Sequence, residues 1–189
     1  MINFPDFQPM LLEIEGSTPC YALVMVLKHE KINREGRLKF VACFRNKNVR
    51  ICAQMMPAFY LFSRWHVHAE PFLEFNENRD WFDIRLTKPR QISKKAIYYC
   101  HHLRSIKDTF WAVGLHSKAK THAMRGSDSR KAEMLGTSET AIHCLGRWNN
   151  SALTKNYLNH LPREAIRTLA GFTSVAGQFY LVRATTVFS

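Results

Sequence analysis

Four side chains in the C-terminal half have the types and spacing needed to hold and attack a phosphodiester: His122, Arg125, Trp148 and Tyr157. His122 and Arg125 are three residues apart, so on a helix they share one face. A guanidinium presents a planar fork to phosphate and stays charged, and an imidazole can move a proton near neutral pH. A tyrosine hydroxyl could then act as the nucleophile.

Each of these residues alone has a more ordinary explanation. An HxxR pair is usually helix surface, and a helical tyrosine or tryptophan usually belongs to the core. The hypothesis of a phosphate site therefore depends on the combination.

Capping residues divide this half of the chain into short helices. The predicted helices are His122–Leu135 (N-cap Thr121, closing Gly136), a helix from Thr137 or Ser138 to Gly146, one from Asn150 or Ser151 through His160, and one from Pro162 to Gly171.

The N-terminal half predicts a β-hairpin. Cys20–Lys28 is a continuous apolar run typical of a buried strand, and Arg37–Phe44 alternates basic and apolar residues like a half-exposed strand. Asn33–Gly36 forms the turn between them. The tip of the hairpin carries the basic residues Lys28, Lys31, Arg34 and Arg37.

The middle of the chain predicts two further helices. Pro57 begins a helix through Trp65 that gives Phe59, Tyr60, Phe62 and Trp65 to the core. Val67–Ser93 is predicted as loop with a short strand near Trp81–Leu86, and Lys94–Val113 as a helix that Gly114 ends. The predicted fold class is α+β and mainly helical, with a small antiparallel sheet packed on the helical body, in one domain over residues 1–189.

Charge indicates a polyanionic partner. The net charge is +12 and 46% of the residues are hydrophobic, as in a globular basic protein. Basic blocks at Lys28–Arg50 and Arg85–Lys131 flank an acidic block at Glu70–Asp83. Nucleic acid is the first expectation and an anionic membrane the second.

Other site classes are disfavoured. The apolar run Met55–Phe62 is too short for a membrane span, and the N-terminus lacks a basic region typical of a secretory signal, so an intracellular protein is expected. Five scattered cysteines predict buried free thiols. The pairs His66/His68 and His101/His102 lack partners at metal-ligand spacing and are interpreted as rim histidines. No metal, cofactor or small-molecule substrate is expected.

In combination, the four residues resemble the tyrosine recombinases, which include phage integrases. The resemblance lies in THAMRGSDSRKAEMLGTSETAIHCLGRWNNSALTKNYLNHLP, where Trp148 of the Gly-Arg-Trp turn lies nine residues before Tyr157. The flanks LPREAIRTLAGF, RLKFVACFRNKNVRIC and AFYLFSRW are similar to the fungal branch of this superfamily. That branch holds the Crypton-type transposon recombinases and the second domain of the centromere DNA-binding inner-kinetochore subunit.

The resemblance implies a role for each residue. Tyr157 would form a 3′-phosphotyrosyl bond, Arg125 would hold the non-bridging oxygens, and His122 would act as acid or base. Trp148 would pack against the site and donate its indole N–H. Lys31 would protonate the leaving 5′ oxygen, with Lys28 as the fallback.

The chain departs from the superfamily in one respect. The superfamily places a second arginine before the hairpin, whereas the first arginine here is Arg34. We therefore expect a fragment without the N-terminal clamp domain and first-arginine helix, or a domesticated DNA binder. Catalysis is left open: the first hypothesis is a non-catalytic binder of double-stranded DNA, centromeric or transposon-derived, and the second is the catalytic fragment of a strand-transfer recombinase.

The expected partner is duplex DNA in the nucleus, with a homo-oligomer on the DNA compatible with this interpretation. Phosphate contacts, which position without reading sequence, are expected from Lys118, Lys120, Arg130 and Arg147 as well as the hairpin tip. A basic helical RNA-binding protein is a third hypothesis, which predicts no preference for duplex DNA.

Overall fold

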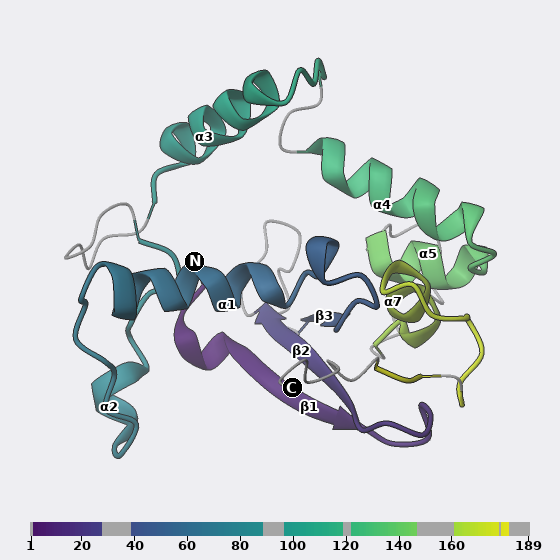
Figure 1. Ribbon diagram of the computed structural model, residues 1–189, viewed down its shortest axis with the longest axis horizontal. Coiled ribbons are helices and arrows are strands. Elements are labelled where there is room, and N and C mark those ends of the chain that lie inside the picture. Colours follow the sequence, from purple (N-terminus) through teal and green to yellow (C-terminus); the bar gives the residue numbers. More distant parts are fainter. Residues whose placement is uncertain are drawn as a thin grey trace, which may run out of the picture.

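The protein combines a small antiparallel sheet with surrounding helices, as Figure 1 shows for the computed structural model. The structure describes residues 2–27, 39–88, 97–118, 122–146, 161–177 and 179–181. The predicted α+β, mainly helical fold class is confirmed.

The sheet has three strands in the order β1-β2-β3, namely β1 (Phe7–Leu12), β2 (Cys20–Leu27) and β3 (Lys39–Phe44). Both pairs are antiparallel, and Ala22 of β2 lies between Met10 and Phe44. The predicted pairing of the apolar run with Arg37–Phe44 is confirmed over Lys39–Phe44. The predicted hairpin tip lies outside the described residues.

Strand β1 is the element that the sequence analysis missed. It contains Pro9, which lacks a backbone N–H and argues against a central strand. At the edge of the sheet this loss is tolerated. A short 3-10 helix, η1 (Phe4–Asp6), leads into it.

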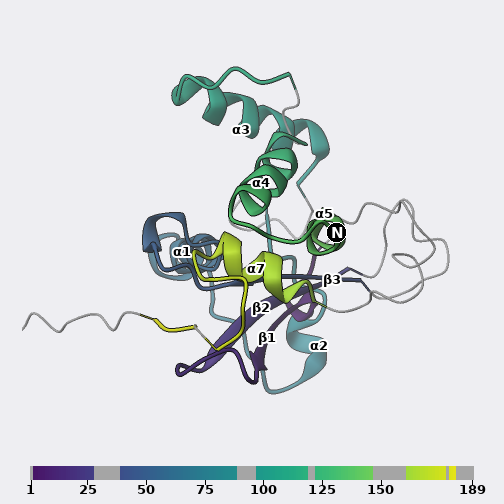
Figure 2. The ribbon, with the colours of Figure 1, turned by 90° about the vertical axis from the view of Figure 1, so that its right-hand side faces the viewer.

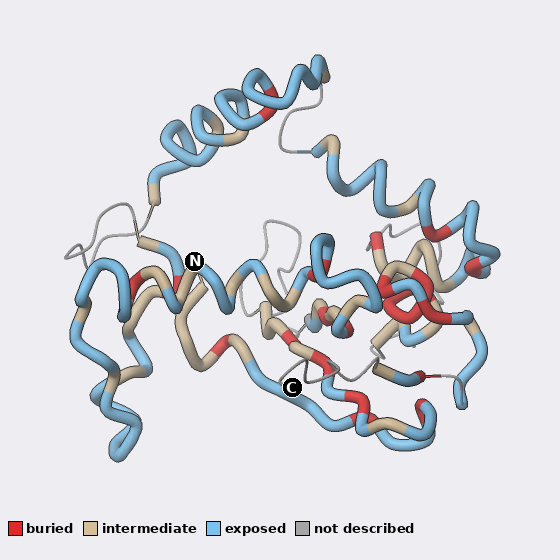
Figure 3. Tube along the Cα trace, in the orientation of Figure 1, coloured by how far each residue is buried: buried red, intermediate tan, exposed pale blue. Residues whose placement is uncertain are grey.

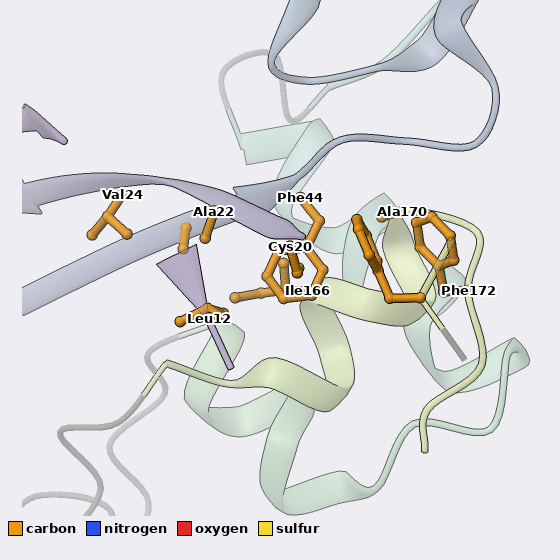
Figure 4. Packing of buried hydrophobic residues seen from close by; sticks show 10 residues of the cluster. Leu12, Cys20, Ala22, Val24, Phe44, Ile166, Ala170 and Phe172 are labelled. Carbon is orange, nitrogen blue, oxygen red and sulfur yellow. The ribbon is translucent and has the colours of Figure 1, made fainter. Parts of the chain in front are cut away.

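The core forms where the sheet meets helix α7 (Arg163–Leu169) and the chain after it (Figure 4). The buried apolar members of this core are Leu12, Cys20, Ala22, Val24, Ala42, Phe44, Ile166, Ala170, Phe172 and Phe179. Phe179 packs edge-on against Phe44, with ring centroids 5.9 Å apart, and against Phe172 at 4.5 Å. The alternation of β2 sends Cys20, Ala22 and Val24 into this core.

A buried ion pair joins the two ends of the described chain. Glu15 and Arg167 are 2% and 1% exposed, and the Arg167 guanidinium donates to both the carboxylate and the backbone carbonyl of Glu15. Arg163 contacts the same carboxylate, with its Nη1 3.2 Å from Oε1. Because a buried charge is costly without its partner, this pairing fixes α7 against the loop that follows β1.

The middle of the chain differs most from the prediction. Helix α1 (Met55–Phe62) begins before Pro57 and continues into a π-helical turn, η3 (Ser63–Val67). The prediction that Phe59 and Phe62 belong to the core is wrong, since they are 61% and 57% exposed. Neither residue belongs to the core that the sheet forms with α7 and Phe179.

The strand predicted near Trp81–Leu86 is also absent from the described residues 2–27 and 39–88. The segment instead forms α2 (Asn78–Trp81) and a single β-bridge between Asn3 and Arg85. A second short 3-10 helix, η2 (Val49–Ile51), links β3 to α1.

Helix α3 (Tyr99–Ala112) lies away from the sheet in both orthogonal views (Figures 1 and 2). The predicted helix was longer at its start, since Ile97 and Tyr98 precede α3, whereas its predicted end at Gly114 is confirmed by a φ of 68°. The Cα trace in Figure 3, coloured by burial, shows that α3 and α4 (Ala123–Met134) are mostly exposed. Their buried residues are Phe110 and Ala132.

Candidate nucleic-acid interface

Helix α4 begins with the predicted His-x-x-Arg pair. His122 occupies the N-cap position and is exposed, and the first turn that contains Arg125 carries no acidic residue. The free backbone N–H groups and partial positive charge of a helix N-terminus favour an anion. Position and charge together make this turn suitable for a phosphate.

The Arg125 side chain reaches from α4 to the end of α5 (Glu139–Gly146), where its Nη2 donates to the backbone carbonyl of Gly146. The last carbonyls of a helix lack intrahelical partners, and a cation is favoured beside them. Gly146 immediately precedes Arg147 and Trp148. The structure thus brings Arg125 to the start of the Gly-Arg-Trp segment.

Polar contacts fix α4, α5 and α7 relative to one another. The buried hydroxyls of Thr137 and Thr168 are 2.7 Å apart, and Thr137 N–H donates to the Ala132 carbonyl at 3.0 Å. Ser138 caps α5 by accepting from Ala141 N–H at 3.4 Å, and its own N–H donates to Glu164 at 2.6 Å. These contacts set the position of Arg125 relative to Gly146.

The ends of these helices agree with the capping pattern, whereas the N-cap of α4 is His122, one residue later than the predicted Thr121. Gly136 and Gly171 adopt positive φ angles of 77° and 83° after α4 and α7. Ser138 is the cap of α5, one of the two predicted alternatives. Pro162 is at the N-cap of α7, one position before the predicted first turn.

Arg130 does not share a face with Arg125. Five residues of helix rotate a side chain by about 140°, and both residues are exposed. Lys118, in the segment before α4, is also exposed. The basic residues of this region therefore surround α4 instead of converging on Arg125.

Helix α3 adds two exposed basic residues, Arg104 and Lys107, that the sequence analysis counted only within a basic block. Their spacing of three residues places them on one helix face. This three-residue spacing is visible in the sequence and could have indicated a basic helix face.

The remaining predicted site residues lie outside the residues that the structure describes. These are Tyr157, Trp148, Lys31, Lys28, Arg34, Arg37, Lys120 and Arg147. Their roles stay predictions.

The cysteines form no disulfide, and burial raises the pKa of Cys43 to about 11 and that of Cys144 above its ordinary value. Such thiols are neutral near pH 7 and poor nucleophiles. The prediction of burial is wrong for Cys100, which is exposed on α3.

The described ranges contain neither a cluster of metal ligands nor a helix that could span a membrane. Within them, no group of three or more His, Cys, Asp or Glu side chains is placed to hold a metal ion. His66, His68, His101 and His102 are exposed. No described helix has the length and apolar character needed to cross a membrane.

Comparison with known families gives one match. Residues 1–188 match the family described as the centromere DNA-binding protein complex CBF3 subunit, domain 2. No curated protein and no solved structure matches the chain. Because the match spans almost all 189 residues, the chain belongs to the family of the centromere DNA-binding protein complex CBF3 subunit, domain 2.

Proposed function

We propose that the chain is a DNA-binding domain that acts on double-stranded DNA in the nucleus, as part of centromere or kinetochore function. The observation that carries this proposal is the family match over residues 1–188, since the family is described by its binding of centromere DNA. The net charge of +12 supports the same partner, because basic proteins gain affinity for DNA by releasing counterions.

The first turn of α4 is the proposed phosphate contact. It combines the helix N-terminus, His122 and Arg125. Arg125 has five N–H donors, so its bond to the Gly146 carbonyl is compatible with phosphate binding. Lys118, Arg130 and the α3 residues Arg104 and Lys107 would contact more distant phosphates.

We infer that this fold descends from the tyrosine recombinases. The order of His122, Arg125, Trp148 and Tyr157 supports that descent, and the contact from Arg125 to the residue before Arg147 is compatible with it. The whole chain would then act as one recombinase-derived domain.

Binding without catalysis is the preferred form of the proposal. Two arginines, Arg64 and Arg167, are buried in the described part of the chain, and each is paired with a carboxylate, Glu70 and Glu15 respectively. Neither is available to serve as a second phosphate-binding arginine. A site without a second arginine would face a reaction barrier higher by about 3 kcal/mol.

The second candidate function, DNA strand transfer, rests on the presence of Tyr157 at recombinase spacing. A nicked suicide DNA substrate tests it, because a 3′-phosphotyrosyl adduct would accumulate and shift the protein band in a denaturing gel. We expect tight duplex binding and no adduct. An adduct that Tyr157→Phe abolishes would establish the enzyme, and equal competition by RNA would refute a preference for duplex DNA.

A further inference from the structure

The segment around α2 lies at the opposite end of the ribbon from α4 and α5 (Figure 1), and together with Trp65 it carries a continuous set of aromatic rings. We call it the aromatic face; its members are Trp65, Phe72, Phe75, Trp81 and Phe82. Successive ring centroids are 4.7, 6.1, 5.4 and 4.7 Å apart. The rings therefore form one contiguous surface around α2.

This surface is more exposed than a core would be. Phe72, Phe75 and Phe82 are 63%, 49% and 41% exposed. Single exposed apolar residues are ordinary, but contiguous exposed patches mark interaction sites. Aromatic side chains also supply much of the binding energy of protein interfaces.

A buried ion pair and its hydrogen bonds hold the segment that carries the aromatic face. The buried Arg64 guanidinium binds the Glu70 carboxylate through two hydrogen bonds of 2.8 and 2.7 Å and donates to the Leu86 carbonyl at 2.9 Å. Lys88 contacts the same carboxylate. Together these bonds tie both ends of the segment that carries Phe72, Phe75, Trp81 and Phe82. A surface held in this way loses little conformational entropy when a partner binds.

The charge around the aromatic face excludes DNA as its occupant. The segment Glu70–Asp83 has five acidic residues and one arginine, Arg79. The Arg79 guanidinium lies 2.6 Å from the Glu77 carboxylate, which offsets its charge locally. Glu74, Glu77, Asp80 and Asp83 are exposed. Such a border repels phosphate and attracts a cation-rich partner.

We propose that the aromatic face docks a lysine- or arginine-rich protein segment that also carries apolar side chains. The apolar side chains of the partner would cover Phe72, Phe75 and Phe82, and its basic residues would meet the acidic border. This second surface would leave α4 and the basic residues around it open to DNA.

Fluorescence anisotropy with a labelled helical peptide of lysine, leucine and alanine tests the docking. The expected result is saturable binding with a Kd of about 10 µM. Phe75→Ser should weaken it about tenfold, because an exposed ring at the centre of the face is lost. The pair Glu77→Gln and Asp80→Asn, both exposed, should weaken it about fivefold at low salt without disturbing folding.

Phe59→Ser is the matched control, since Phe59 is an exposed ring on α1 outside the aromatic face, 61% exposed against 49% for Phe75. Its peptide affinity should match that of the unsubstituted chain, and duplex DNA affinity should be the same for Phe59→Ser and Phe75→Ser. The docking proposal can therefore fail while the DNA-binding proposal stands.

Three results would overturn the docking proposal. One is the absence of saturable peptide binding. Another is equal binding of an all-lysine peptide, which would show that charge alone acts. The third is a dimer, in sedimentation equilibrium, that Phe75→Ser dissociates, because a second copy would then occupy the aromatic face.

Discussion

Arg125 has a proposed role in phosphate binding and an observed role in holding two helices together. Its guanidinium spans from the first turn of α4 to the Gly146 carbonyl at the end of α5. It therefore ties the first turn of α4 to the end of α5, and in the proposed interface it would also supply charge to a phosphate. A substitution at this residue should affect DNA affinity more than its charge alone would.

We predict that Arg125→Ala weakens binding to a duplex about tenfold, or about 1.4 kcal/mol, in an anisotropy titration. The loss combines one phosphate contact with the bond to Gly146. Arg125→Lys should restore only part of the affinity, because an ammonium lacks the planar fork.

Arg79→Ala provides the control for net charge. It removes the same charge from an exposed side chain in the acidic segment around α2. We expect little change in DNA affinity. An equal loss for Arg79→Ala and Arg125→Ala would mean that overall charge, and not the position of Arg125, determines binding.

At the scale of elements, close backbone approaches decide which substitutions are tolerated. A Cβ at Gly16 would lie 2.3 Å from the backbone oxygen of Phe179, whereas a Cβ at Gly126 within α4 would meet no heavy atom within 4 Å. Substitution of these two glycines by alanine should therefore change the stability of the protein in opposite directions.

Gly16→Ala should lower the free energy of unfolding by about 2 kcal/mol or more, because the C-terminal segment must move away from the core. Gly126→Ala should raise it by about 0.8 kcal/mol through helix propensity. Urea unfolding monitored by circular dichroism measures both. A stable Gly16→Ala protein would contradict the packing of Phe179 against the loop after β1.

The elements also show what local sequence could and could not predict. Gly114, Gly136 and Gly171 marked helix ends correctly because a positive φ is a local requirement. The apolar run of β2 also predicted a strand correctly, because that pattern too is local in the sequence. Strand β1 was missed because Pro9 is acceptable only at a sheet edge, a position set by the fold.

Contacts between residues far apart in the sequence were also harder to predict than contacts between neighbouring helices. The bond from Arg125 to Gly146 joins neighbouring helices, and spacing placed both residues at helix ends. The pairing of Arg167 with Glu15 spans 152 residues, and no local pattern marks it. The prediction that Phe59 and Phe62 are core residues was wrong, because the core forms between the sheet, α7 and Phe179, which are distant from α1 in the sequence.

At the scale of the whole molecule, a group of exposed basic residues and the acidic border of the aromatic face lie on different elements. The exposed basic residues Arg104, Lys107, Lys118 and Arg130 lie on and around α3 and α4, and the acidic aromatic face lies around α2. This division would orient the protein on DNA with α2 directed away from the phosphates. Affinity that rests on phosphate contacts must fall as salt rises.

The affinity for a duplex at two salt concentrations is the most direct test of DNA binding through the basic surface. Between about 50 and 200 mM salt, six or more phosphate contacts predict a loss of about a thousandfold in affinity, and the logarithm of the affinity should fall linearly with the logarithm of the salt concentration. A Kd that stays constant over that range would contradict DNA binding through phosphate contacts.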